Sequence, residues 1–131
     1  MKTMRIHGIG IDIVDTARIQ ESIERFGDRF IDRIFTESEK AYCSAMTASE
    51  RNYAARFAAK EAIAKALGTG IGAELAWTDM EILRNANGKP GVKLTGSGKA
   101  FMDRNGIVEI QISLSHADNH AAANAIAVAY D

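Results

Sequence analysis

Three side chains of kinds that carry out chemistry stand in settings unlike those of ordinary surface residues. Asp12 lies among glycines and isoleucines, Glu61 lies among cationic residues in an alanine-rich segment, and His116 follows an alternating segment. Mg²⁺ prefers hard oxygen ligands and keeps several waters, so two carboxylates can supply part of its coordination shell. The sequence therefore offers Asp12 and Glu61 as a magnesium pair, provided that the fold brings them together.

A phosphate-bearing ligand would complete such a site, because phosphate oxygens attract cationic side chains and backbone amides. Lys65, His116 and the backbone amides of residues 68–72 are suitable partners for it. A plainer interpretation of the histidine stays open, since a histidine at the end of a strand is often a structural hydrogen-bonding residue.

Glu61 and Lys65 belong to a segment that predicts a long helix from about Ser49 to Leu67. Ala, Leu, Lys and Glu are strong helix formers, and Gly68 can take the left-handed conformation that ends a helix. Phe57, Glu61 and Lys65 would then form one row at i, i+4 spacing, with the two charged residues as neighbours.

We expect Arg56, Lys60 and Lys65 to surround Glu61 with positive charge on this helix. Such a cluster suits a site that binds anionic ligands. The alternative is a solvated helix with one i, i+4 ion pair, which contributes little to stability.

Residues 5–14 alternate between β-branched and other side chains, which predicts a strand. One face would carry isoleucines and the other Gly8, Gly10 and Asp12. Because the two glycines have no side chains, we expect room for a bulky group to approach Asp12. Asp15 is predicted to cap the helix that follows.

Shorter helices are predicted in the rest of the N-terminal half, at residues 16–26, 28–35 and 36–46. Thr36 and Glu39 fit a capping box at the start of the third. Arginines recur through this region, at Arg18, Arg25, Arg29 and Arg33. They form either a solvated cationic face or a docking surface for an acidic partner.

The C-terminal half predicts strands at residues 77–83, 92–94, 108–115 and 121–130, and a helix at 96–104 capped by Thr95. Asn87-Gly88 is a two-residue hairpin signal, and the last two strands are expected to pair across residues 118–119. The predicted fold class is α+β, a single small domain with a mainly antiparallel sheet packed against one long and several shorter helices.

Composition bounds the class of protein. A hydrophobic fraction of 47% and a net charge of -1 fit one globular domain and argue against general nucleic-acid binding. The single cysteine, Cys43, excludes an internal disulfide framework and is expected to be a buried structural thiol. Neither a run of ~20 apolar residues nor a signal peptide is evident, so we expect a cytoplasmic location without membrane partners.

Four segments together resemble the holo-acyl-carrier-protein synthases, the short group of 4′-phosphopantetheinyl transferases. They are GIGIDIVD at 8–15, RFAAKEAIAKALGTGIG at 56–72, NGKP at 87–90 and SLSHA at 113–117. The resemblance extends from about Ile6 over nearly the whole chain. The set is specific in this order and spacing, whereas GIDI or SHA alone would not be.

The resemblance implies a homotrimer with active sites at subunit interfaces. It also implies Mg²⁺-dependent transfer of the 4′-phosphopantetheine of coenzyme A to a serine of apo-acyl-carrier protein for fatty acid biosynthesis, with release of adenosine 3′,5′-bisphosphate. The implied roles are metal ligation by Asp12 and Glu61; catalysis by Glu61, Lys65 and His116; coenzyme A binding by Arg56, Lys65, Gly88, Lys89, Pro90 and His116; and carrier-protein binding by Arg18, Arg29 and Phe30.

Either Glu61 or a metal-bound water that it holds is expected to accept the serine proton. Two other functions stay open. One is a transferase of broader specificity, whose known examples look like two fused copies of this unit. The other is a non-catalytic nucleotide-binding or oligomeric scaffold, against which the presence of Asp12, Glu61 and Lys65 counts.

Overall fold

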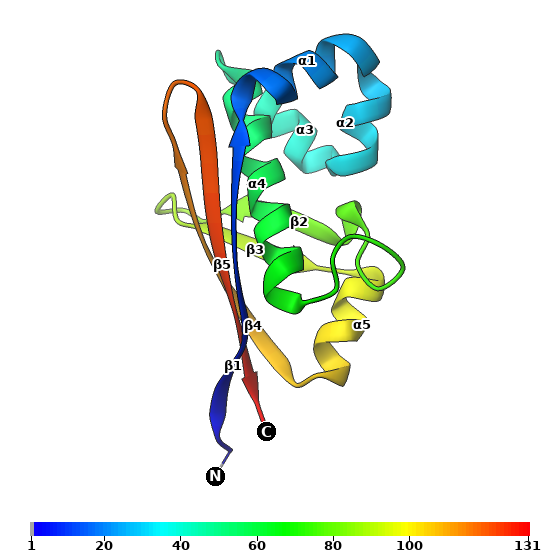
Figure 1. Cartoon of the computed structure of the whole chain (residues 1–131), viewed down its shortest axis with the longest axis vertical. Coiled ribbons are helices and arrows are strands. Elements are labelled where there is room, and N and C mark those ends of the chain that lie inside the picture. Colours follow the sequence, from blue (N-terminus) through cyan, green and yellow to red (C-terminus); the bar gives the residue numbers. More distant parts are fainter. Residues whose placement is uncertain (1) are drawn as a thin grey trace.

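The computed structural model describes residues 2–131, and Figure 1 shows the arrangement of its helices and strands. The chain runs β1 (Met4–Asp15), α1 (Thr16–Phe26), α2 (Asp28–Ile34), α3 (Glu37–Ser44), α4 (Ser49–Leu67), the 3-10 turn η1 (Trp77–Asp79), β2 (Met80–Arg84), β3 (Pro90–Leu94), α5 (Gly96–Arg104), β4 (Ile107–His116) and β5 (His120–Tyr130). Helix α4 lies along the sheet, with α1–α3 at one end of the molecule and α5 toward the other.

The strands form two antiparallel sheets. β1, β5 and β4 make a three-stranded sheet with β5 in the centre, and β2 and β3 make a separate hairpin. The predicted α+β class and mainly antiparallel sheet are thus confirmed. In the part of the chain that the structure describes, no helix is long and apolar enough to span a bilayer.

The long helix α4 is the centre of the fold, because 12 of its 19 residues are buried. Its alanines meet the buried alanines of β5, including Ala123, Ala125 and Ala127. Gly8 and Gly10 of β1 face the same helix, and a Cβ atom on either would collide with the backbone oxygen of Ala66 or Ala62. The expectation of open space beside Asp12 is therefore wrong at the glycines, because the helix backbone occupies it.

The opposite face of the sheet is apolar and exposed. Ile9, Ile11 and Ile13 of β1 are 71%, 62% and 65% exposed, and Ile126 of β5 is 39% exposed. Large aliphatic side chains gathered on one face of a sheet are unusual for an isolated subunit and indicate an interaction surface.

The start of the C-terminal half differs from prediction in three places. Residues Trp77–Asp79 form a 3-10 turn, so β2 begins only at Met80. The hairpin loop spans residues 85–89 rather than two residues, and Asn85 N donates to Lys89 O across it. Thr95 does not cap α5 with its side chain; Asp79 instead accepts hydrogen bonds from Gly98 N and the Ser97 hydroxyl.

The capping predictions of the N-terminal half are confirmed. Asp15 Oδ1 accepts a hydrogen bond from Ala17 N at 2.9 Å, and Thr36 and Glu39 form a complete capping box. Cys43 is fully buried, and burial raises the pKa of its thiol to about 11, so it stays protonated at neutral pH and is a structural thiol as predicted.

Candidate active site

Asp12, Glu61 and Lys65 are brought together where β1 crosses α4. Lys65 Nζ lies 3.2 Å from Asp12 Oδ1 and donates to Ile11 O at 2.8 Å. Glu61 lies one turn earlier on the same helix, which puts it beside Lys65. Gly10 makes this possible, because a side chain there would strike the backbone of Ala62 and the Cβ of Lys65 and push α4 away.

The two carboxylates repel each other. Burial raises the pKa of Glu61, the charge of Asp12 raises it further, and Lys65 opposes both. A divalent cation between these groups would relieve the repulsion, so the residues present fit a magnesium ion. Among residues 2–131 no group of three or more His, Cys, Asp or Glu side chains forms a metal site, so the protein would supply two carboxylates and leave the remaining positions to water and substrate.

Lys65 is the one predicted cation that stands beside this carboxylate pair. The predictions for the other two are wrong in part, since Arg56 is 2% exposed and Lys60 is fully buried. Arg56 lies over the Tyr42 ring at 4.3 Å, and its Nε atom has no hydrogen-bond partner. Lys60 forms an ion pair with the buried Glu39 at 2.7 Å and points away from solvent.

His116 and the Gly88–Pro90 turn lie apart from the carboxylate pair within one chain. His116 is the last residue of β4, pairs with Ala121 of β5 and is exposed. Strand β5 therefore lies between His116 and β1 in the sheet. The turn lies at the tip of the β2–β3 hairpin, where Gly88 has a φ of 86° and its carbonyl accepts a hydrogen bond from Arg84. Among the described residues, neither His116 nor this turn forms a hydrogen bond or ion pair with Asp12, Glu61 or Lys65.

The predicted docking residues lie on α1 and α2, at the end of the molecule where α4 begins (Figure 1). Arg18 and Arg29 are exposed, and Phe30 is half-buried. Phe30 stacks on Phe57 at 6.5 Å, and Phe57 stacks on Trp77 at 5.2 Å. Because Phe57 precedes Glu61 by one helical turn, this aromatic row connects α2 with the part of α4 that carries the carboxylate.

Sequence reasoning found Glu39 as a capping residue but missed its buried ion pair with Lys60. The local sequence contained little signal, because 12 of the 19 residues of α4 are buried and the helix has no single apolar face; only the structure shows that Lys60 lies beside the buried Ile63 and Ala64. A lysine on an apolar side of a helix needs a buried acceptor, and such an acceptor comes here from α3.

Comparison with known proteins identifies the class. The family model of the 4′-phosphopantetheinyl transferase superfamily matches residues 8–126. A holo-[acyl-carrier-protein] synthase of Ruminiclostridium cellulolyticum is 45% identical over 119 residues, covering 90% of this chain and 89% of that protein. One of Chlamydia pneumoniae is 45% identical over 126 residues, covering 96% of this chain and all of the other.

Solved structures agree. The Helicobacter pylori holo-[acyl-carrier-protein] synthase in complex with coenzyme A matches with a TM-score of 0.82 and 36% identity, covering 91% of this chain and 98% of that one. The Neisseria meningitidis synthase matches with a TM-score of 0.89 and 34% identity, covering 94% and 98%. The chain therefore belongs to the 4′-phosphopantetheinyl transferase superfamily. Both its resemblance to the holo-acyl-carrier-protein synthases and the prediction of a phosphopantetheinyl transferase enzyme are confirmed.

Proposed function

We propose that residues 1–131 form one transferase domain that moves the 4′-phosphopantetheine group of coenzyme A to a serine of apo-acyl-carrier protein. Adenosine 3′,5′-bisphosphate is the second product. The observation that carries the proposal is the meeting of Asp12, Glu61 and Lys65 across β1 and α4. The names of the relatives, and the coenzyme A bound to the Helicobacter pylori enzyme, support these substrates.

Asp12 and Glu61 would hold Mg²⁺. When bound, the ion neutralises charge on the pyrophosphate of coenzyme A. The Lys65 side chain is 52% exposed and flexible, so its ammonium can turn from Ile11 O toward phosphate oxygens. There it would stabilise the negative charge that grows on the phosphate and on the departing bisphosphate.

The reaction forms a bond between the serine oxygen and the β-phosphorus of coenzyme A, and breaks the bond from that phosphorus to the bisphosphate oxygen. The serine proton must leave as the oxygen attacks. We propose that Glu61, or a water that it holds, accepts this proton. His116 is proposed as a further phosphate contact.

A homotrimer would complete the site. The exposed isoleucines of β1 supply an apolar face for a neighbouring copy. His116 and the turn Gly88-Lys89-Pro90 are apart from Asp12 within one chain, and contributions from two chains would join them. We propose that Arg56 and this turn contact coenzyme A.

The carrier protein is proposed to dock on Arg18, Arg29 and Phe30, because exposed arginines attract an acidic partner and steer its approach. We assign the reaction to fatty acid biosynthesis in the cytoplasm.

Intact-mass measurement of an apo-acyl-carrier protein tests the proposal, after incubation with this protein, coenzyme A and Mg²⁺. A gain of one phosphopantetheine mass, abolished by a chelator, is the expected result. No gain with several acidic carrier proteins, from protein shown to be folded, would favour a nucleotide-binding scaffold instead.

A further inference from the structure

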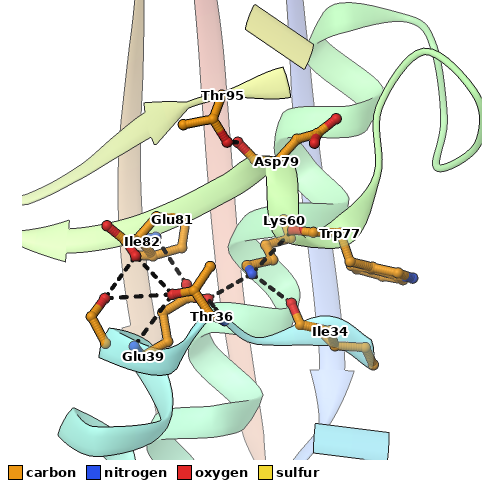
Figure 2. Close-up of polar contacts among 10 residues, drawn as sticks. Ile34, Thr36, Glu39, Lys60, Trp77, Asp79, Glu81, Ile82 and Thr95 are labelled. Carbon is orange, nitrogen blue, oxygen red and sulfur yellow. Dashed lines mark hydrogen bonds and ion pairs between the residues drawn. The ribbon is translucent and has the colours of Figure 1, made fainter. Parts of the chain in front are cut away.

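The buried lysine of α4 joins three elements of the fold. Lys60 Nζ donates to Glu39 Oε1 at 2.7 Å, to Ile34 O at 2.6 Å and to Trp77 O at 3.2 Å. Ile34 ends α2, Glu39 lies in the first turn of α3, and Trp77 begins η1. All three protons of one ammonium are therefore used, and each reaches a different element (Figure 2).

Glu39 extends the network to a fourth element. Its Oε1 atom also accepts from Thr36 N at 2.8 Å, and its Oε2 atom accepts from Ile82 N of β2 at 2.9 Å. The side chains of Glu39 and Lys60 are both 0% exposed. Such a pair lacks contact with water, so its geometry is fixed by these partners alone.

In the described part of the chain the β2–β3 hairpin shares no ladder of hydrogen bonds with the three-stranded sheet, so its attachments are the core packing of Met80, Ile82 and Leu94 and its polar contacts with α3. Besides the bond from Ile82 N to Glu39, the hydroxyls of Thr36 and Ser38 donate to Glu81 Oε2 at 2.9 and 2.8 Å. These two hydrogen bonds lower the pKa of Glu81, so its carboxylate is ionised at neutral pH. The start of α3 thus contacts β2 through two carboxylates, the buried Glu39 of α3 and the half-buried Glu81 of β2.

The elements that meet at Lys60 carry the proposed substrate contacts. α2 bears Arg29 and Phe30, the β2–β3 hairpin ends in the Gly88–Pro90 turn, and Lys60 immediately precedes Glu61 in the sequence. We infer that Lys60 and Glu39, together with Glu81, are positioning residues, which set the carrier-docking helix and the coenzyme A hairpin against the helix that bears the catalytic carboxylate. This inference rests on the proposed function.

Stability alone does not explain such a pair. A buried ion pair loses the hydration of both charges, and apolar residues of similar volume often stabilise a fold as well or better. Burial lowers the pKa of Lys60, and the charge and hydrogen bond of Glu39 oppose that shift. What apolar residues cannot supply is directional bonding to two backbone oxygens and two backbone amides at once, which fixes the relative placement of the elements.

Two variants and one control separate positioning from general stability. Glu81→Ala removes the half-buried carboxylate that accepts hydrogen bonds from the hydroxyls of Thr36 and Ser38. It leaves the buried Lys60–Glu39 ion pair intact. Lys60→Met keeps the length of the stem and removes every bond of the ammonium. Lys40→Met is the matched control, because Lys40 joins α2 and α3 through ion pairs with Asp32 and Glu37 at the surface and has no bond to the hairpin.

The measurements are the KM for coenzyme A and for carrier protein, kcat, the dissociation constant for coenzyme A, and amide hydrogen exchange over residues 80–94. Glu81→Ala is expected to raise the KM and the dissociation constant for coenzyme A by about threefold to tenfold, because binding must then order a few more side chains of the hairpin. The KM for carrier protein should not change. Faster exchange at residues 80–94 should accompany it. Lys60→Met is expected to raise both KM values, and Lys40→Met neither.

A merely structural role predicts a different result, in which kcat falls with the folded fraction while both KM values and the exchange of the hairpin stay as in wild type. That result for Glu81→Ala overturns the inference even if Lys60→Met fails to fold. Absence of transfer by the wild type would instead refute the proposed function, and the exchange measurement would still decide whether α3 holds the hairpin.

Discussion

Lys65 Nζ on α4 lies 3.2 Å from Asp12 Oδ1 on β1, so the helix and the strand share an ion pair at the centre of the candidate site. The pair is partly exposed and weak enough to open when a phosphate arrives. Lys65 therefore has two partners at different stages, a carboxylate in the free protein and a phosphate oxygen in the proposed complex. Its position beside both carboxylates explains how two like charges coexist before a metal binds.

Asp12→Ala should lower phosphopantetheine transfer by about a hundredfold, because metal-assisted charge stabilisation is worth several kcal/mol. The Mg²⁺ concentration for half-maximal rate should also rise. Mass spectrometry of carrier protein across a Mg²⁺ titration measures both effects. Asp118→Ala, which removes an exposed partner of Arg51, is the control. Full activity with a weaker Mg²⁺ requirement would refute the metal assignment.

Glu61→Gln should change the pH dependence of stability. Burial and Asp12 raise the pKa of Glu61 above its ordinary value of 4.5, so the folded chain binds this proton more tightly than the unfolded chain. Stability from this group is then complete below the unfolded pKa and is lost as pH rises through the folded pKa. Glutamine cannot ionise, so the variant should gain stability relative to wild type at neutral pH but not under acidic conditions.

Urea unfolding in metal-free buffer over this pH range measures the effect of Glu61→Gln. Adding Mg²⁺ should narrow the difference at neutral pH, since only the wild type has both carboxylate ligands. In the transfer assay the same variant should be nearly inactive. A variant that binds metal normally and keeps full turnover would exclude Glu61 as the base.

Arg29→Glu should raise the KM for carrier protein by about tenfold at low salt, because it places a like charge against an acidic partner. The KM for coenzyme A should not change. Arg104→Glu makes the same charge change on α5, far from α2, and should affect neither KM. Added salt should reduce the effect of Arg29→Glu on the KM for carrier protein. A KM for carrier protein that does not change with salt concentration would contradict electrostatic steering.

Ile11→Lys should dissociate the proposed trimer, because it puts a charge in the middle of the apolar face formed by β1. Sedimentation velocity should show single chains, and transfer should fall with assembly. Met46→Lys changes an exposed apolar residue outside that face and should leave the sedimentation coefficient unchanged. A wild type that is already monomeric at micromolar concentration would be evidence against interface active sites.

Gly10→Ala should lower the free energy of unfolding by about 3 kcal/mol, the upper end of the usual cost of overpacking, because its Cβ meets helix backbone that cannot move aside. Transfer should fall as well, since Asp12 and Lys65 would separate. Gly91→Ala is the control, because Gly91 also lies in a strand but has open space around it. Equal urea midpoints for the two variants would mean that α4 can shift at little cost.

Much of the fold could be predicted because its local signals agree with its tertiary contacts. The alternation of Ile126 and Val128 with alanines identified β5 despite the high helix propensity of alanine, and Asp15 and Thr36 mark helix starts. Trp77 misled the prediction, because aromatic residues are frequent in strands. There Asp79 bends the chain by accepting from Ala76 N, and its same oxygen caps α5, a contact invisible in local sequence.

The site could be predicted in its centre and not in its surroundings. Asp12, Glu61 and Lys65 were found and do meet. The burial of Lys60 was missed because an alanine-rich helix buried on most sides has no distinct apolar face for the periodicity to mark. His116 and the hairpin turn are separate from this centre in one chain, and their placement beside it stays a prediction about neighbouring subunits.

The pairing of β1 with β5 has a consequence for synthesis of the chain. Among the described residues, β1 has β5 as its only neighbouring strand, and about a hundred residues lie between the two strands. At ribosomal speeds that interval lasts roughly 5 to 20 s. Throughout it the isoleucine-rich β1 has no partner strand, although α4, which packs on its other face, is synthesised earlier. The central sheet closes only when the final strand has emerged.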